Sequence, residues 1–260
     1  TDEAFEALAA SLKQADARVR RQVVADLGGF FREPARAVLM RVLADEKNPD
    51  IQAEALRALG AYHQPAVREL LLRELASDSY QSVRAGAAIE AMRKQDDAGF
   101  IGPLRDRLRT SENVFPGAVF ARGLDTLAWL ARNEQKKDEV REFLTDYVNS
   151  HRHRVQLAAL TALGTLGDPK AAVVLEKFAG GSRQSRQRGA AEQALVRLRE
   201  SPRAPSELST LRKELGDLQT ENRQLRKELE ELKKKLEARP SSKPAPSPVP
   251  TRKPVKADRR

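Results

Sequence analysis

The sequence predicts an all-α protein whose main part is a right-handed solenoid of helical hairpins. Apolar or small residues recur at four-residue steps and repeat with a long period, and a leucine heptad pattern follows them. Aromatic residues make up only 5% of the chain. This scarcity argues against an all-β sandwich, because strands favour aromatic side chains. The prediction is therefore helical throughout.

The four-residue steps predict one helix in each of six repeats within residues 1–200, because this spacing keeps side chains on one helical face. The first residues of successive copies are 32, 32, 37, 35 and 32 positions apart. The copies are Val19, Val23 and Leu27; Ile51, Ala55 and Leu59; Val83, Ala87 and Ala91; Phe120, Leu124 and Ala128; Val155, Ala159 and Leu163; and, more weakly, Gln187, Ala191 and Leu195.

A second apolar helix is predicted before each of these, for example over 35–43, 66–75, 101–108 and 171–178. Four of them have a proline near the start, which the first turn of a helix tolerates: Pro34, Pro65, Pro103 and Pro169. We expect left-handed glycine caps at Gly28, Gly60 and Gly164. One hairpin cannot bury its apolar face alone, so the six should stack.

Three stretches carry a family resemblance: 51–60 (IQAEALRALG), 83–92 (VRAGAAIEAM) and 159–176 (ALTALGTLGDPKAAVVLE). They resemble HEAT-like repeats of the bacterial PBS-lyase type, and the resemblance covers about residues 2–199. A tetratricopeptide array fits less well, because its aromatic positions are mostly missing. The resemblance implies an extended concave surface that binds a protein partner.

A linker, 201–206, separates the repeats from a heptad pattern over 207–238. Leucines occupy eight of the nine core positions, and Asn222 falls at position a. The core positions are Leu208, Leu211, Leu215, Leu218, Asn222, Leu225, Leu229, Leu232 and Leu236. Three of the four g-to-e pairs join a glutamate to a cation, as in a parallel two-stranded coil. We therefore expect a parallel homodimer, with a trimer as the alternative.

A DNA-binding zipper would need a basic helix continuous with the coil. Pro202 and Pro205 interrupt any such helix. The net charge of +10 also lies mostly at one end, since residues 1–150 carry 22 Lys and Arg against 24 Asp and Glu. The region 239–260 is rich in proline and basic residues and is predicted to be disordered. Nucleic-acid binding is therefore not expected.

One polar position recurs directly after the first apolar residue of five repeats: Arg20, Gln52, Arg84, Gln156 and Arg188. Stacked repeats would align these residues in a column. Two interpretations stay open. The column is either a polar ladder on a binding face or a set of structural contacts with nearby turns, such as Arg20 with Asp16.

The sequence offers no catalytic, metal-binding or cofactor-binding motif, so we expect no cofactor. Cysteine is absent, which excludes disulfides, Cys-ligated zinc and thiol catalysis. His151 and His153 are two residues apart, and on a helix this places them on different faces. Phe120 and Trp129 are expected in the core.

These features predict a non-enzymatic protein-interaction scaffold that is dimerised by the coil. One alternative is a C-terminal accessory module of a larger enzyme, because the arrangement also resembles the C-terminal region of large bacterial zinc aminopeptidases of the aminopeptidase N type. None of that family's catalytic motifs has a match here. A more remote resemblance is to lyases that act on bilins. No transmembrane stretch or leader is seen. The compartment stays open, with a cytoplasmic location favoured.

Overall fold

A computed structural model describes residues 2–182, 185–200 and 218 of the chain. The chain divides into two units, Thr1–Ser209 and Thr210–Arg260. The predicted coil over 207–238 and the tail over 239–260 lie outside the described residues, apart from Leu218. The fold described below is that of the first unit.

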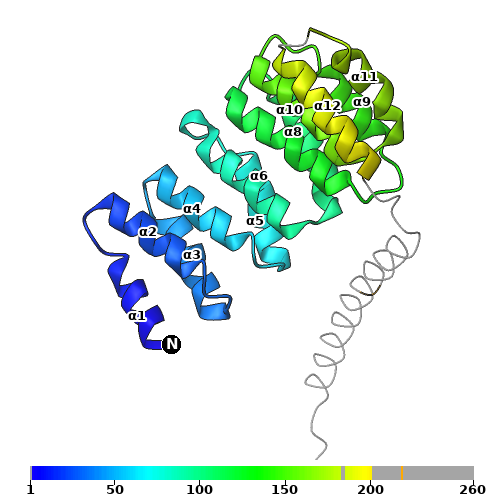
Figure 1. Cartoon of the computed structure of the whole chain (residues 1–260). Helices are drawn as coiled ribbons and strands as arrows, with labels where there is room; N and C mark the ends of the chain where they lie inside the picture. Colours follow the sequence, from blue (N-terminus) through cyan, green and yellow to red (C-terminus); the bar gives the residue numbers. More distant parts are fainter. Residues whose placement is uncertain (1, 183–184, 201–217, 219–260) are drawn as a thin grey trace, which may run out of the picture. The chain divides into compact units, whose positions relative to one another are not determined.

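The first unit is a series of six antiparallel helical hairpins (Figure 1). The first helices are α1 (Asp2–Ser11), α3 (Glu33–Asp45), α5 (Pro65–Leu75), α7 (Ile101–Thr110), α9 (Asp138–Asp146) and α11 (Ala172–Ala179). The second helices are α2 (Ala17–Leu27), α4 (Pro49–Leu59), α6 (Val83–Gln95), α8 (Gly117–Ala131), α10 (His153–Leu166) and α12 (Arg186–Glu200). Short 3-10 turns precede α6, α7 and α11, namely η1 (Tyr80–Ser82), η2 (Ala98–Phe100) and η3 (Pro169–Ala171). The predicted all-α solenoid is confirmed.

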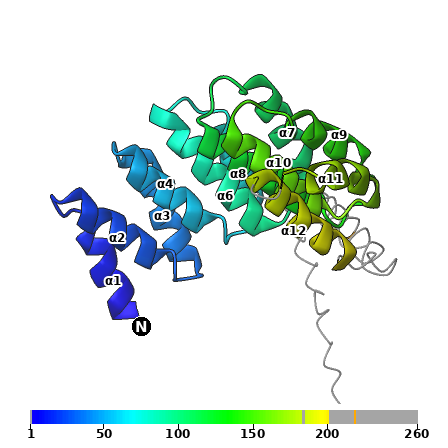
Figure 2. The same ribbon diagram turned by 45° about the horizontal axis from the view of Figure 1, so that its top comes forward.

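The second helices stack on one another in chain order, from α2 to α12, and each first helix packs against its own second helix (Figures 1 and 2). Every predicted apolar triplet lies on a second helix. The side chains of Ile51, Leu59, Phe120, Leu124 and Leu163 are fully buried. The periodic apolar face is therefore the face that joins neighbouring repeats.

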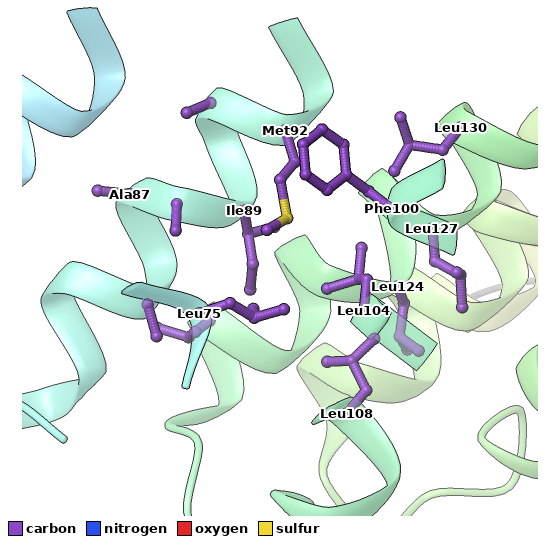
Figure 3. Packing of buried hydrophobic residues seen from close by; sticks show 14 of the residues in the cluster. Leu75, Ala87, Ile89, Met92, Phe100, Leu104, Leu108, Leu124, Leu127 and Leu130 are labelled. Atoms are coloured by element: carbon purple, nitrogen blue, oxygen red, sulfur yellow. The ribbon is translucent and has the colours of Figure 1, made fainter. Parts of the chain in front are cut away.

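The core is continuous along the stack, and the contact between the third and fourth hairpins illustrates it (Figure 3). Met92 on α6 and Phe100 before α7 lie against each other there, and Leu104, Leu124 and Leu127 extend the same apolar layer. All five side chains are completely buried. Burial of this kind stabilises by about 1.5–3 kcal/mol per large side chain, which explains why hairpins that are marginal alone persist as an array.

Helix starts follow the chemistry expected from the sequence. Pro34 and Pro65 occupy the first turns of α3 and α5. The side chain of Asn48 accepts the N–H of Asp50 at the start of α4, and Asp168 accepts the N–H of Lys170 before α11. These caps satisfy backbone donors that a helix leaves unpaired.

The expectation of left-handed caps at three glycines is wrong. Gly28 and Gly60 end α2 and α4 with φ of −62° and −57°, in the right-handed region. Gly164 lies inside α10, and that helix ends instead at Gly167, whose φ of 64° is left-handed. These three glycines are therefore needed for something other than backbone conformation.

Their role is to allow close approach of neighbouring second helices. A Cβ added at Gly60 would lie 2.8 Å from the Cα of Ala91 on α6, and one at Gly164 would lie 2.6 Å from the Cα of Ala194 on α12. Carbon atoms pack at about 3.5–4.0 Å. Glycine at these positions thus lets the backbones of adjacent repeats meet directly, and a larger residue would push them apart.

The last hairpin is polar and exposed at a position that is apolar and buried in α2, α4 and α10. Five residues after each repeat's first apolar position, α2, α4 and α10 carry the fully buried Val24, Leu56 and Leu160. The corresponding residue of α12 is Glu192, whose side chain is 51% exposed and pairs with Arg188. Solenoids need such polar terminal repeats because no further repeat covers them.

Among the described residues, no helix has the length and apolar character needed to cross a membrane.

Candidate functional site

The predicted polar column lies at the loops that join the two helices of each hairpin. Arg20 forms an ion pair with Glu46, with Nε and Oε2 2.9 Å apart, and its Nη1 also donates to the carbonyl oxygens of Gln14 and Ala15 at 2.8 Å. Gln52 donates to the carbonyl of Glu46 at 2.7 Å. The first two members therefore hold the loops of the first two hairpins.

The remaining members make the same kind of contact. Arg84 pairs with the buried Glu74 at the end of α5, at 2.5 Å. Gln156 donates to the carbonyl of Val148 at 2.8 Å, and Arg188 reaches the carbonyl of Gly181 at 3.4 Å. These contacts favour the structural interpretation of the column. The specific pairing of Arg20 with Asp16 is not made, because Asp16 binds Arg18 instead.

The exposed side of the second helices carries a different set of charges. We call the connected group Arg21, Glu54, Arg57, Glu90 and Arg122 the ion-pair row. Glu54 binds Arg21 at 3.4 Å and Arg57 at 3.2 Å, and Glu90 binds Arg57 at 2.5 Å and Arg122 at 2.9 Å. The row thus crosses α2, α4, α6 and α8 without interruption, and it was missed by the sequence analysis.

Exposure is unequal along the ion-pair row. The side chains of Arg21 and Arg122 are 57% and 42% exposed, whereas those of Glu54 and Glu90 are only 20% and 27% exposed. Arg57, at 28%, is about as exposed as Glu90. The glutamates therefore lie beneath the guanidinium groups of Arg21 and Arg122 and orient them. A molecule that approaches this side meets mainly positive charge.

Trp129 on α8 lies beside the row and is only partly buried, so its predicted place in the core is wrong in part. The guanidinium carbon of Arg132 lies 3.8 Å from the ring centroid, and that of Arg93 lies 4.5 Å from it. Arg132 also binds both carboxylate oxygens of Asp96, at 2.6 and 2.7 Å. The cation–π contacts hold the indole in place and occupy its ring faces.

Asp125, one helical turn before Trp129, is the most perturbed carboxyl group on this side. Burial raises its pKa to about 6, against the smaller opposing effects of Arg93 on α6 and Arg197 on α12.

The raised pKa predicts a pH-dependent effect of Asp125→Asn. The carboxyl group of Asp125 holds its proton more tightly in the folded chain than in the unfolded chain. Its favourable contribution to the free energy of unfolding is therefore present below about pH 4 and is lost as the pH rises through about 6. We expect Asp125→Asn to match the wild type near pH 4 and to be more stable by about 2 kcal/mol at pH 7. Urea unfolding at several pH values measures this difference, and a difference that does not change with pH would contradict the assignment.

A second ladder joins the first helices of neighbouring repeats. Arg68 pairs with Asp97 at 2.7 Å, Arg141 pairs with Asp168 at 2.7 Å, and Arg105 pairs with Glu139. Arg68 and Arg105 are 37 positions apart, and Arg105 and Arg141 are 36 positions apart. The repeat period could therefore have identified them, although not their partners.

A groove of about 380 Å³ lies between the loop after α7 and the end of α9. Phe143 and Tyr147 are buried in it, with Arg109, Glu112 and His151 at its exposed edge. Burial and the nearby Glu112 raise the pKa of Tyr147 to about 12. The phenol therefore stays protonated at neutral pH and is no base. Within the described part of the chain, no cluster of three potential metal-ligating side chains occurs.

Three solved structures are similar to this chain at low sequence identity. A chain in the complex of CpcE and CpcF of phycocyanin lyase from Nostoc sp. PCC7120 superposes with a TM-score of 0.51 and 19% identity, over 74% of this chain and 75% of that one. An engineered protein gives a TM-score of 0.48 and 20% identity, over 76% and 97%. Human deoxyhypusine hydroxylase gives 0.32 and 17%, over 76% and 85%. No curated protein matches the sequence.

The family model for HEAT repeats matches residues 5–93 and 101–196, which is most of the chain and nearly all of the solenoid. These bounds agree with the six hairpins seen in the structure. The chain belongs to the HEAT-repeat family.

Proposed function

We propose that the protein is a non-enzymatic scaffold that binds a protein partner on the exposed side of its second helices and is dimerised by the coil. The observation that carries this proposal is the ion-pair row, because it presents oriented charges continuously across four repeats. The two groups whose pKa values are most raised, Asp125 and Tyr147, do not form a pair of acid and base that would serve catalysis.

The repeat architecture supports this choice. Stacked hairpins give a long surface on a rigid core, and such surfaces suit extended protein partners. The structural neighbour from Nostoc is itself one component of a complex between two proteins. The comparisons lend no support to the alternative of an aminopeptidase accessory region, since the family match is to the repeats alone.

Dimerisation would add avidity. Two linked binding surfaces can engage two sites at once, and the second event then benefits from a high effective concentration. The heptad leucines at 207–238 and the polar Asn222 at a core position are the basis for expecting a parallel pair.

Deleting residues 207–238 is expected to convert the dimer to a monomer. Light scattering should then give the molar mass of one shortened chain. The buried leucine seam supplies the association energy in this proposal, so no dimer should remain. Deleting 239–260 instead is the control, and this variant should stay dimeric. A monomeric full-length chain, or a dimer that survives loss of the coil, would contradict the dimer proposal.

A further inference from the structure

The second helices present a series of cations on their exposed side. Besides the arginines of the ion-pair row, Arg93 on α6 donates to the carbonyl oxygen of Asp125 at 3.3 Å, and Arg197 is exposed on α12. Five second helices carry a cation of this group. Arg21 (α2), Arg122 (α8) and Arg197 (α12) are exposed, whereas Arg57 (α4) and Arg93 (α6) are half-buried.

Within the ion-pair row the carboxylates are less exposed than Arg21 and Arg122. Asp26 on α2, at the repeat position that Glu90 has in α6, is exposed. Glu54, Glu90 and Asp125 lie between the arginines, and the two glutamates are each bound by two of them. The exposed charge is therefore positive but interrupted. This pattern contrasts with residues 1–150 as a whole, where acidic residues slightly outnumber basic ones.

We infer that this side binds an extended acidic peptide with a carboxylate at about every third residue. Packed helices lie about 8–10 Å apart, and an extended peptide rises about 3.3 Å per residue. Carboxylates three residues apart would thus meet the cations of α2, α4, α6 and α8. The carboxylate over α10 would have no cation from this group, and the next would meet Arg197 on α12. This inference rests on the proposed scaffold function and assigns its partner class.

The interruptions favour a peptide over a nucleic acid. A nucleic-acid strand carries a phosphate at about every 3.4 Å of helix axis, so some of its charges would lie against Glu54, Glu90 or Asp125. A peptide can place neutral residues opposite these carboxylates. The ring of Trp129 is also engaged by Arg93 and Arg132, which leaves it unsuited to stacking on a base.

The peptide carboxylates would bind guanidinium groups that already pair with the glutamates. Arg122 is 42% exposed and binds Glu90 with one nitrogen at 2.9 Å. An arginine has five N–H donors, so it can bind a second carboxylate while keeping the first. The glutamates beneath then act as positioning residues that orient each guanidinium group.

The test uses the full-length chain and a fluorescein-labelled peptide of about 15 residues, long enough to cross from α2 to α12. The peptide has glutamate at every third position among glycine and serine. A second peptide of the same composition has its glutamates in one block, and a single-stranded oligonucleotide of similar length is the third probe. Binding is measured by fluorescence anisotropy at low salt.

The variant is Arg57→Gln/Arg122→Gln/Arg197→Gln. Its matched control is Arg18→Gln/Arg41→Gln/Arg73→Gln, which removes the same charge from exposed positions outside the row. We expect the spaced peptide to bind at least about tenfold more weakly to the variant and within about twofold of wild type to the control. If the melting temperature of the triple variant is lower than that of the control, the double variant Arg122→Gln/Arg197→Gln replaces it, because both side chains are exposed.

Three results would overturn the inference: equal weakening in variant and control, equal binding of the spaced and blocked peptides, or tighter binding of the oligonucleotide than of the spaced peptide. The last result would assign a nucleic-acid partner. Light scattering on the same samples tests dimerisation separately. Loss of peptide binding with an intact dimer therefore refutes the partner class without refuting the coil.

Discussion

Replacing Gly164 with valine is expected to destabilise the last hairpin by about 3 kcal/mol, at the upper end of the usual cost of overpacking. The added Cβ would lie 2.6 Å from the Cα and 2.9 Å from the carbonyl oxygen of Ala194. These are backbone atoms of α12, so no side-chain rotation can relieve the clash. The contact between α10 and α12 must widen instead.

Hydrogen exchange measures this effect locally. Each repeat of a solenoid contacts only its neighbours, so loss of one interface should loosen one end of the array first. Amide exchange should therefore accelerate in α11 and α12 more than in α4 and α6. A uniform acceleration along the chain would contradict this local account.

Gly189→Ala is the matched control on α12. A Cβ there meets no atom within 4 Å. Alanine is a better helix former than glycine by about 1 kcal/mol. We expect this variant to be slightly more stable than the wild type, so the two glycine substitutions should shift stability in opposite directions. Urea unfolding of both variants tests the comparison.

Replacing Arg141 with methionine is expected to cost about 3 kcal/mol, because it leaves a buried carboxylate without its partner. The side chains of Arg141 and Asp168 are 15% and 9% exposed, and Nη1 and Oδ2 lie 2.7 Å apart. Methionine preserves much of the side-chain volume but not the charge. The effect should appear as a lower urea midpoint with an unchanged slope.

A surface pair supplies the control. Arg18 is 92% exposed and pairs with Asp16, so Arg18→Met should change stability by less than about 0.5 kcal/mol. The double variant Arg141→Met/Asp168→Asn should recover part of the loss, because asparagine can keep the hydrogen bond from the N–H of Lys170 without a buried charge. Equal effects of Arg141→Met and Arg18→Met would show that burial of the pair is unimportant.

The candidate site was only partly predictable from sequence. The period of the repeats predicted Arg20, Gln52 and Arg84 in one column, but it could not give the direction of their side chains. In the structure Arg20 and Gln52 contact hairpin loops and Arg84 pairs with Glu74 at the end of α5. Arg21, one residue after Arg20, starts the ion-pair row instead. A shift of one residue turns a helical side chain by about 100°, so the choice between loop and open surface depends on how each helix is rotated in the stack.

The sequence by itself determined the helical class, the six repeats and the position of the apolar face, because these depend on local spacing and on burial that every repeat needs equally. It also led to the HEAT-like resemblance that the family match bears out. Only the tertiary structure decided why Gly60 and Gly164 are glycine, which carboxylate each arginine meets and why the pKa of Asp125 is raised. These properties arise where neighbouring hairpins touch, since distances between helices that are about 30 residues apart in the chain are set by packing and not by local sequence.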